Sequence, residues 1–149
     1  TILDPAPARP LSGELLALVD VLTPNESEAC LLLNRPPQRI NADEAPVIAD
    51  ALRNLGPASV ILKLGESGCY YAGAKESFFV PGFRVQAVDA TAAGDTFNAA
   101  FAVGIAEGHG VAESLRFANA AAAISVTRLG AQSSAPTRED VDDFLAARG

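Results

Sequence analysis

The sequence lacks the features by which several classes of protein are recognised. Its 149 residues contain two cysteines, Cys30 and Cys69, and a chain of this size with its own apolar core needs no disulfide. We therefore expect two buried thiols. No apolar stretch approaches the roughly 20 residues of a membrane-spanning helix, and the opening TILDPAPARP has no secretory pattern. These absences predict a cytoplasmic protein without a membrane partner.

Basic residues are also few. Eleven Lys and Arg stand against 18 Asp and Glu, for a formal net charge of −7, and they are scattered singly, which argues against a nucleic-acid partner. No Gly-x-x-x-x-Gly-Lys-Ser/Thr segment is present, so a P-loop is excluded. The composition is 49% hydrophobic, as in a folded chain, and the length predicts one domain.

Short apolar runs and amphipathic stretches alternate along the first half of the chain, and an Ala-rich helical part follows. The runs bounded by Gly, Pro and Asn predict strands, and the stretches with apolar residues three and four apart predict helices. This order indicates an α/β fold with a mostly parallel sheet. The predicted strands are 1–3, 20–22, 59–64, 69–72 and 78–80, and the predicted helices are 12–18, 25–33, 41–54, 94–107, 111–127 and 137–147.

The segment DATAAGDTFN, residues 89–98, places small residues where a loop enters a predicted helix. The N–H groups of Ala92, Ala93 and Gly94 would be unpaired there, and small side chains would let an anion approach the backbone. Asp95 follows directly. It could accept a proton from a hydroxyl that attacks phosphorus, or it could simply stabilise the first turn of the helix. The local pattern supports the two interpretations equally.

The longer segment DATAAGDTFNAAFAVGIAEG resembles the second signature of the ribokinase family of carbohydrate kinases, the PfkB type, with Thr91 displaced by one position. Further segments match in the order of that family, and together they cover nearly the whole chain. They are DPAPARPL, VDVLTPNESEA, LGESG, VPGFRVQAVD and AAAAISVTRLGAQSSAP.

The resemblance implies a ribokinase-like three-layer α/β/α sandwich with a mostly parallel sheet. Residues 1–149 would form its C-terminal portion, which binds ATP and carries the catalytic base. The N-terminal half, the β lid and the residues that grip the sugar would be absent. The strand ending at Leu3 would then border an open sheet edge, which favours association, for example as a homodimer.

Functional residues follow from the resemblance position by position. Asp95 would be the catalytic base, and Ala92, Ala93 and Gly94 would form the anion hole for the γ-phosphate of ATP. Asn25 and Glu28 match an Asn-x-x-Glu motif that positions phosphate and magnesium-bound waters. On local pattern alone they form a helix capping box, and the two roles are compatible.

The resemblance also implies a nucleotide loop and a site for a monovalent cation, K⁺. Position 63 is often Thr in the family, so Lys63 can instead be interpreted as a strand-end lysine with its ammonium in solvent. Asp89 can likewise be interpreted as the centre of an Asx turn. The nucleotide residues would be Lys63, Leu64, Gly65, Glu66, Ser67, Gly68 and Asn119, and the cation residues Asp89, Thr91, Ser125, Arg128, Gly130 and Ser134.

The activity that this resemblance implies is transfer of the ATP γ-phosphate to a sugar hydroxyl, with D-ribose and its O5 as the first candidate. Fructose, a nucleoside or a keto-sugar acid are alternative substrates, because specificity would depend mainly on the absent half. Another alternative is a catalytically silent remnant that binds nucleotide or a partner. The upstream coding sequence would separate the enzyme from the remnant.

Overall fold

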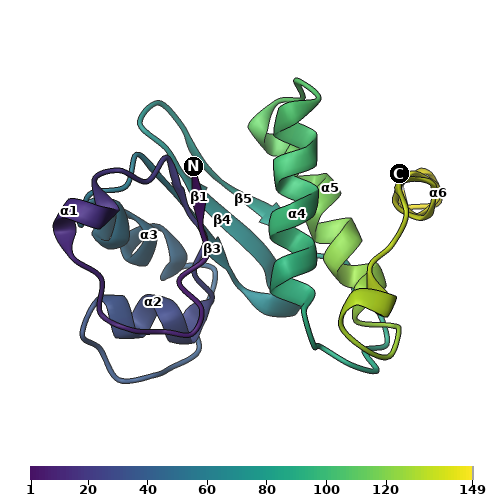
Figure 1. Cartoon of the computed structure of the whole chain (residues 1–149), viewed down its shortest axis with the longest axis horizontal. Helices are drawn as coiled ribbons and strands as arrows, with labels where there is room; N and C mark the ends of the chain where they lie inside the picture. Colours follow the sequence, from purple (N-terminus) through teal and green to yellow (C-terminus); the bar gives the residue numbers. More distant parts are fainter. Residues whose placement is uncertain (149) are drawn as a thin grey trace. The chain divides into compact units, whose positions relative to one another are not determined.

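The computed structural model describes residues 1–148, which fold into two compact units (Figure 1). Unit 1 is Thr1–Val80, and unit 2 begins at Pro81. Among the described residues, no helix has both the length and the apolar composition needed to cross a membrane.

Unit 1 is built on a sheet with the strand order β1-β2-β3-β4-β5. The strands are β1 (Ile2–Leu3), β2 (Val21–Leu22), β3 (Ser59–Lys63), β4 (Gly68–Ala72) and β5 (Ser77–Pro81). The first three run parallel, with Leu3 opposite Leu22 and Leu22 opposite Val60. β4 runs antiparallel to β3. β1 is the first strand of this order, so its outer edge pairs with no strand of residues 1–148.

Three helices accompany the sheet of unit 1: α1 (Gly13–Leu16), α2 (Glu26–Leu32) and α3 (Ala45–Arg53). α3 packs on β3 and β4, and its apolar face of Ala45, Ile48, Ala49 and Leu52 is buried as the spacing predicts. α3 begins later than the predicted start at residue 41. The reason is that Asn41 Oδ1 accepts from the backbone N–H groups of Asp43 and Glu44 and closes a separate turn.

The centre of unit 1 is the β3 run Val60-Ile61-Leu62, whose side chains are fully buried. Strands buried on both faces have continuous rather than alternating apolar sequences, which explains why this segment is recognisable without alternation. Cys30 and Cys69 are buried thiols, as expected.

Unit 2 contains α4 (Ala93–Ala106), α5 (Val111–Ser125) and α6 (Arg138–Ala146). α4 packs against α5, and α5 against α6. α4 and α5 approach each other closely at Gly104: a Cβ atom added there would lie 2.8 Å from the Oγ of Ser114. α6 begins with a capping box in which Thr137 and Asp140 exchange hydrogen bonds between side chain and backbone.

Candidate functional site

Polar residues collect at the carboxyl ends of the three parallel strands of unit 1. Asp4 follows β1, Asn25 follows β2 shortly after its end, and Lys63 is the last residue of β3. Lys63 Nζ lies 3.1 Å from Asp4 Oδ2, and the two side chains are 12% and 22% exposed. The interpretation of Lys63 as a lysine with its ammonium in solvent is therefore wrong. Ligands of open α/β sheets bind at this edge, so the cluster is a candidate site.

Asn25 and Glu28 form the predicted capping box at the start of α2. The backbone N–H of Glu28 donates to Asn25 Oδ1 at 2.9 Å, and the N–H of Asn25 donates to Glu28 Oε2 at 2.7 Å. Asn25 also forms an isolated parallel bridge with Lys63, whose N–H donates to Pro24 O at 2.9 Å. The box is thus attached to the end of β3, and Glu28 is held in a buried position.

A tight turn over Gly65–Ser67 follows β3. It is closed by the N–H of Leu64, which donates to Gly68 O at 2.8 Å, and it includes Gly65 at a φ of +57°. An added Cβ atom at Gly65 would have no neighbour within 4 Å, so the backbone is open on that side. This geometry matches the glycine-dependent turn that the sequence predicts.

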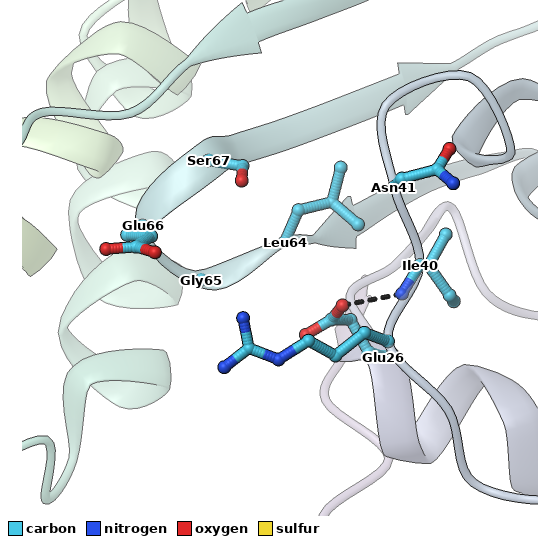
Figure 2. Close-up of a pocket in the computed structure, with 8 residues that line it drawn as sticks. Glu26, Ile40, Asn41, Leu64, Gly65, Glu66 and Ser67 are labelled. Atoms are coloured by element: carbon cyan, nitrogen blue, oxygen red, sulfur yellow. Dashed lines mark hydrogen bonds between the residues drawn. The ribbon is translucent and has the colours of Figure 1, made fainter.

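The turn forms one wall of a pocket of about 580 Å³ in unit 1 (Figure 2). The opposite wall comes from the first turn of α2 and from the loop that precedes α3. The lining residues are Glu26, Arg39, Ile40, Asn41, Leu64, Gly65, Glu66 and Ser67.

The predicted anion hole lies at the start of α4 in unit 2. Ala92 has a left-handed conformation with φ of +59°, which turns the chain into the helix. The N–H of Ala93 donates to Ala90 O at 3.3 Å, whereas the N–H groups of Gly94 and Asp95 have no acceptor within residues 1–148. The Asp95 side chain is exposed in the first helical turn. The backbone N–H groups of Gly94 and Asp95 and the accessible Asp95 carboxylate therefore lie next to each other at the start of α4.

Asp89 connects the loop before α4 to the loop after α5. Its Oδ1 accepts from the N–H of Thr91 at 2.9 Å, and its Oδ2 accepts from the N–H of Gly130 at 3.0 Å. The Thr91 hydroxyl, followed by the backbone N–H groups of Gly130 and Thr91, lowers the pKa of Asp89 below its ordinary value. Asp89 is thus the centre of an Asx turn and also a link between two loops that lie far apart in the sequence.

Three of the six predicted cation residues are therefore brought together, namely Asp89, Thr91 and Gly130. The others form local bonds: the hydroxyl of Ser125 donates to Ala122 O, that of Ser134 to Ala131 O, and the N–H of Arg128 to Ser125 O. The Arg128 guanidinium pairs with Asp140, 3.2 Å away. Asn119, the predicted adenine neighbour, is nearly buried, and its Nδ2 donates to Pro81 O at 3.2 Å.

The sequence patterns assigned no role to Asp4 or to the loop at 39–41. The signal for Asp4 was weak, because it lies 59 residues from Lys63 in the sequence. The loop carries no motif, and only the folded chain brings it opposite the turn at 64–67.

Residues 1–138 match the model of the pfkB family of carbohydrate kinases. The chain belongs to this family. Among its relatives is the ribokinase of Haemophilus influenzae, with 45% identity over 146 residues, which are 97% of this chain and 46% of that protein. The α/β, ribokinase-like fold class predicted from the resemblance is confirmed by solved structures of family members.

One of these solved structures is a ribokinase of Thermotoga maritima, with a TM-score of 0.85 and 44% identity over 97% of this chain and 48% of that one. Another is the ribokinase of Arabidopsis thaliana complexed with ribose and ATP. It has a TM-score of 0.88 and 37% identity over 97% of this chain and 46% of that one. The chain spans about half the length of the relatives it matches.

Proposed function

We propose that this chain is the ATP-binding, base-carrying portion of a ribokinase-family sugar kinase. The reaction is transfer of the γ-phosphate of ATP to a sugar hydroxyl, with D-ribose converted to ribose 5-phosphate as the first candidate. The observation that carries the proposal is the start of α4, where the exposed Asp95 carboxylate adjoins the unfilled N–H groups of Gly94 and Asp95. The relatives named ribokinase support the substrate class.

In the proposed reaction, Asp95 accepts the proton of the attacking sugar hydroxyl. A positioned base of this kind contributes a factor of about 10² to 10⁴ to the rate. The N–H groups of Gly94 and Asp95, which have no acceptor within residues 1–148, stabilise negative charge, and the positive end of the α4 dipole favours an anion there. ATP supplies the phosphoryl group, and the residues of this chain supply the proton acceptor and the charge stabilisation.

The donor set at the carboxyl edge of unit 1 fits a nucleotide with Mg²⁺. The capping box uses Asn25 Oδ1 and Glu28 Oε2, which leaves the Asn25 amide N–H groups for a phosphate oxygen and Glu28 Oε1 for a magnesium-bound water. Mg²⁺ keeps most of its waters and takes few direct protein ligands. The open backbone of the 64–68 turn is a further proposed nucleotide contact of unit 1, and Asn119 is proposed as a contact of unit 2 from the family resemblance alone.

The loops joined by Asp89 fit a monovalent cation such as K⁺. Their contribution would come from carboxylate, hydroxyl and backbone oxygens, the ligands that a hard cation prefers. The hydroxyls of Ser125 and Ser134 donate their hydrogens to backbone carbonyls, so their oxygen lone pairs remain available. In this proposal the residues that would hold the cation also fix the loop that carries Ala92–Gly94.

The nucleotide half of the proposal is tested by titrating ADP into the 149-residue chain by calorimetry. Asp95→Asn should bind ADP at least as tightly as the wild type, because it removes a negative charge beside the phosphate site. Asp142→Asn, another exposed aspartate of unit 2, is the matched control and should leave the affinity unchanged. Failure of the wild-type chain to bind ADP would refute the proposal.

The transfer half needs the part of the relatives that this chain does not span. We would join to this chain the portion of the H. influenzae ribokinase that it does not span and measure ribose-dependent release of ADP. Asp95→Asn should reduce the rate by about 10² to 10⁴, whereas Asp142→Asn should not. A folded chimera that binds nucleotide without transferring phosphate would favour the silent remnant, and a panel of fructose, nucleosides and sugar acids would test specificity.

A further inference from the structure

The pocket of unit 1 is bounded by segments that are far apart in the sequence. The turn at 64–67 forms one wall, and Glu26 with the loop at 39–41 forms the other. Figure 2 shows Leu64, Gly65, Glu66 and Ser67 along the turn, with Glu26 and Ile40 facing them. A volume of about 580 Å³ lies within the roughly 300–1,000 Å³ of small-molecule sites.

The loop at 39–41 is fixed in place. The N–H of Ile40 donates to Glu26 Oε1 at 2.7 Å, as drawn in Figure 2. The Ile40 side chain is buried in the core, and Asn41 is bound to the turn that precedes α3. Because Ile40 and Asn41 are anchored, the backbone of Arg39 has a defined position beside the pocket.

Some of the charged side chains around the pocket have hydrogen-bond partners, and others have none within residues 1–148. Arg39 is exposed, and within residues 1–148 its guanidinium has no ion-pair partner. Glu26 is partly used by the N–H of Ile40, and Glu66 is exposed on the turn. The pocket therefore offers a ligand the Arg39 guanidinium, which has up to five N–H donors. It also offers the carboxylates of Glu26 and Glu66 and the open backbone at Gly65.

We infer that Arg39 is a further nucleotide-binding residue, whose guanidinium binds a phosphate group of the nucleotide that lies along the 64–67 turn. This inference rests on the proposed function, because it takes the turn to be a nucleotide contact. Arginine binds phosphate through two parallel, charge-assisted hydrogen bonds.

The ligand class follows from the carboxylates. Glu26 and Glu66 would repel a bare inorganic phosphate, whereas they can accept hydrogen bonds from the hydroxyl groups of a ribose or from waters bound to Mg²⁺. A nucleoside di- or triphosphate can bind the Arg39 guanidinium through a phosphate and also donate hydrogen bonds to the carboxylates of Glu26 and Glu66. An isolated phosphate ion can bind only the guanidinium.

The test compares ADP, adenosine and inorganic phosphate as calorimetric probes on the 149-residue chain. Arg39→Gln should weaken ADP binding about 10- to 100-fold, the range expected for loss of a charged hydrogen-bond partner, and should leave adenosine binding unchanged. Arg39→Lys should give an intermediate loss, because it keeps the charge without the bidentate geometry. The matched control is Arg35→Gln, an exposed arginine of the same loop that does not line the pocket. Urea unfolding of each variant checks that the fold is retained.

The outcomes separate this inference from the proposed function. Absence of ADP binding to the wild-type chain would refute both. Equal ADP affinity of the wild type and Arg39→Gln would overturn only the role of Arg39, and so would an equal loss for adenosine and ADP. Arg39-dependent binding of inorganic phosphate as tight as that of ADP would overturn the nucleotide as ligand.

Discussion

The carboxylate of Asp4 and the ammonium of Lys63 form an ion pair, 3.1 Å apart, between two strands that are not neighbours. Asp4 follows β1 and Lys63 ends β3, and β2 lies between these strands. The pair therefore crosses the carboxyl edge of the parallel part of the sheet. Both side chains are mostly covered, which distinguishes the pair from an exposed ion pair of little energetic value.

Removal of one partner of this pair should destabilise unit 1. We expect Asp4→Asn and Lys63→Met each to lower the free energy of unfolding by about 1–3 kcal/mol, because each substitution breaks an ion pair whose two side chains are mostly covered. Urea unfolding followed by circular dichroism measures this loss. The double variant should lose less than the sum of the two, and strict additivity would show that the two side chains do not interact.

The link between Asp89, Thr91 and Gly130 should make stability depend on acid pH. The pKa of Asp89 is lower in the folded chain than in the unfolded chain. Its contribution to the free energy of unfolding is therefore fully present above the pKa of the unfolded chain and is lost as the pH falls through the pKa of the folded chain. The difference in unfolding midpoint between the wild type and Asp89→Asn should be constant above about pH 5 and shrink below the ordinary value of 3.8.

Asp142→Asn is the control for this pH series, because Asp142 is exposed. Its side chain makes no hydrogen bond or ion pair within residues 1–148, so the variant controls for the loss of one carboxylate. A midpoint difference for Asp89→Asn that is unchanged down to pH 3 would contradict the stabilising role of these hydrogen bonds.

Local patterns accounted for most elements of the fold. The spacing of Ala45, Ile48, Ala49 and Leu52 predicts the buried face of α3 because a helix repeats every 3.6 residues. The capping residues Asn25 and Thr137 mark helix starts because their side chains bond N–H groups three residues away. Interactions of such short range are encoded in adjacent residues and can be recognised without the fold.

Contacts between distant segments could not be predicted in this way. The ion-pair partner of Lys63 is 59 residues away, and no spacing rule connects a lysine to an aspartate at that separation. The loop at 39–41 and the turn at 64–67 meet because α3 and β3 return the chain to the same edge of the sheet. The family resemblance supplied the roles proposed for Asp95 and the 64–68 turn, whereas Arg39 became a candidate only through its place in the pocket.

The close approach of α4 and α5 should tolerate no side chain at position 104. An added Cβ atom there would lie 2.8 Å from Ser114 Oγ and 3.1 Å from Ser114 Cα. Overpacking of this kind costs about 1–3 kcal/mol, although alanine would gain up to about 1 kcal/mol of helix propensity over glycine. We expect Gly104→Ala to lower the thermal midpoint and Ser114→Gly to restore part of the loss in the double variant. Gly110→Ala, where an added Cβ atom meets nothing within 4 Å, should be nearly neutral.

The two capping boxes separate a structural role from a nucleotide-binding role. Asn25 and Thr137 cap α2 and α6 with the same geometry, but only Asn25 belongs to the proposed nucleotide site. Alanine at either position should lower the free energy of unfolding by about 1 kcal/mol, the usual cost of a lost cap. ADP affinity, measured by calorimetry under conditions where both variants are folded, should fall for Asn25→Ala and remain unchanged for Thr137→Ala.

The variant Asn25→Asp separates the capping role of Asn25 from its proposed role in ADP binding more clearly than Asn25→Ala does. Aspartate caps a helix about as well as asparagine, so the stability of the chain should be largely kept. The substitution replaces an amide donor with a negative charge, and it should therefore weaken ADP binding at least as much as Asn25→Ala does. If Asn25→Asp instead binds ADP like the wild type, the Asn25 side chain serves the helix alone, and the phosphate contact proposed for it must come from another residue of the carboxyl edge.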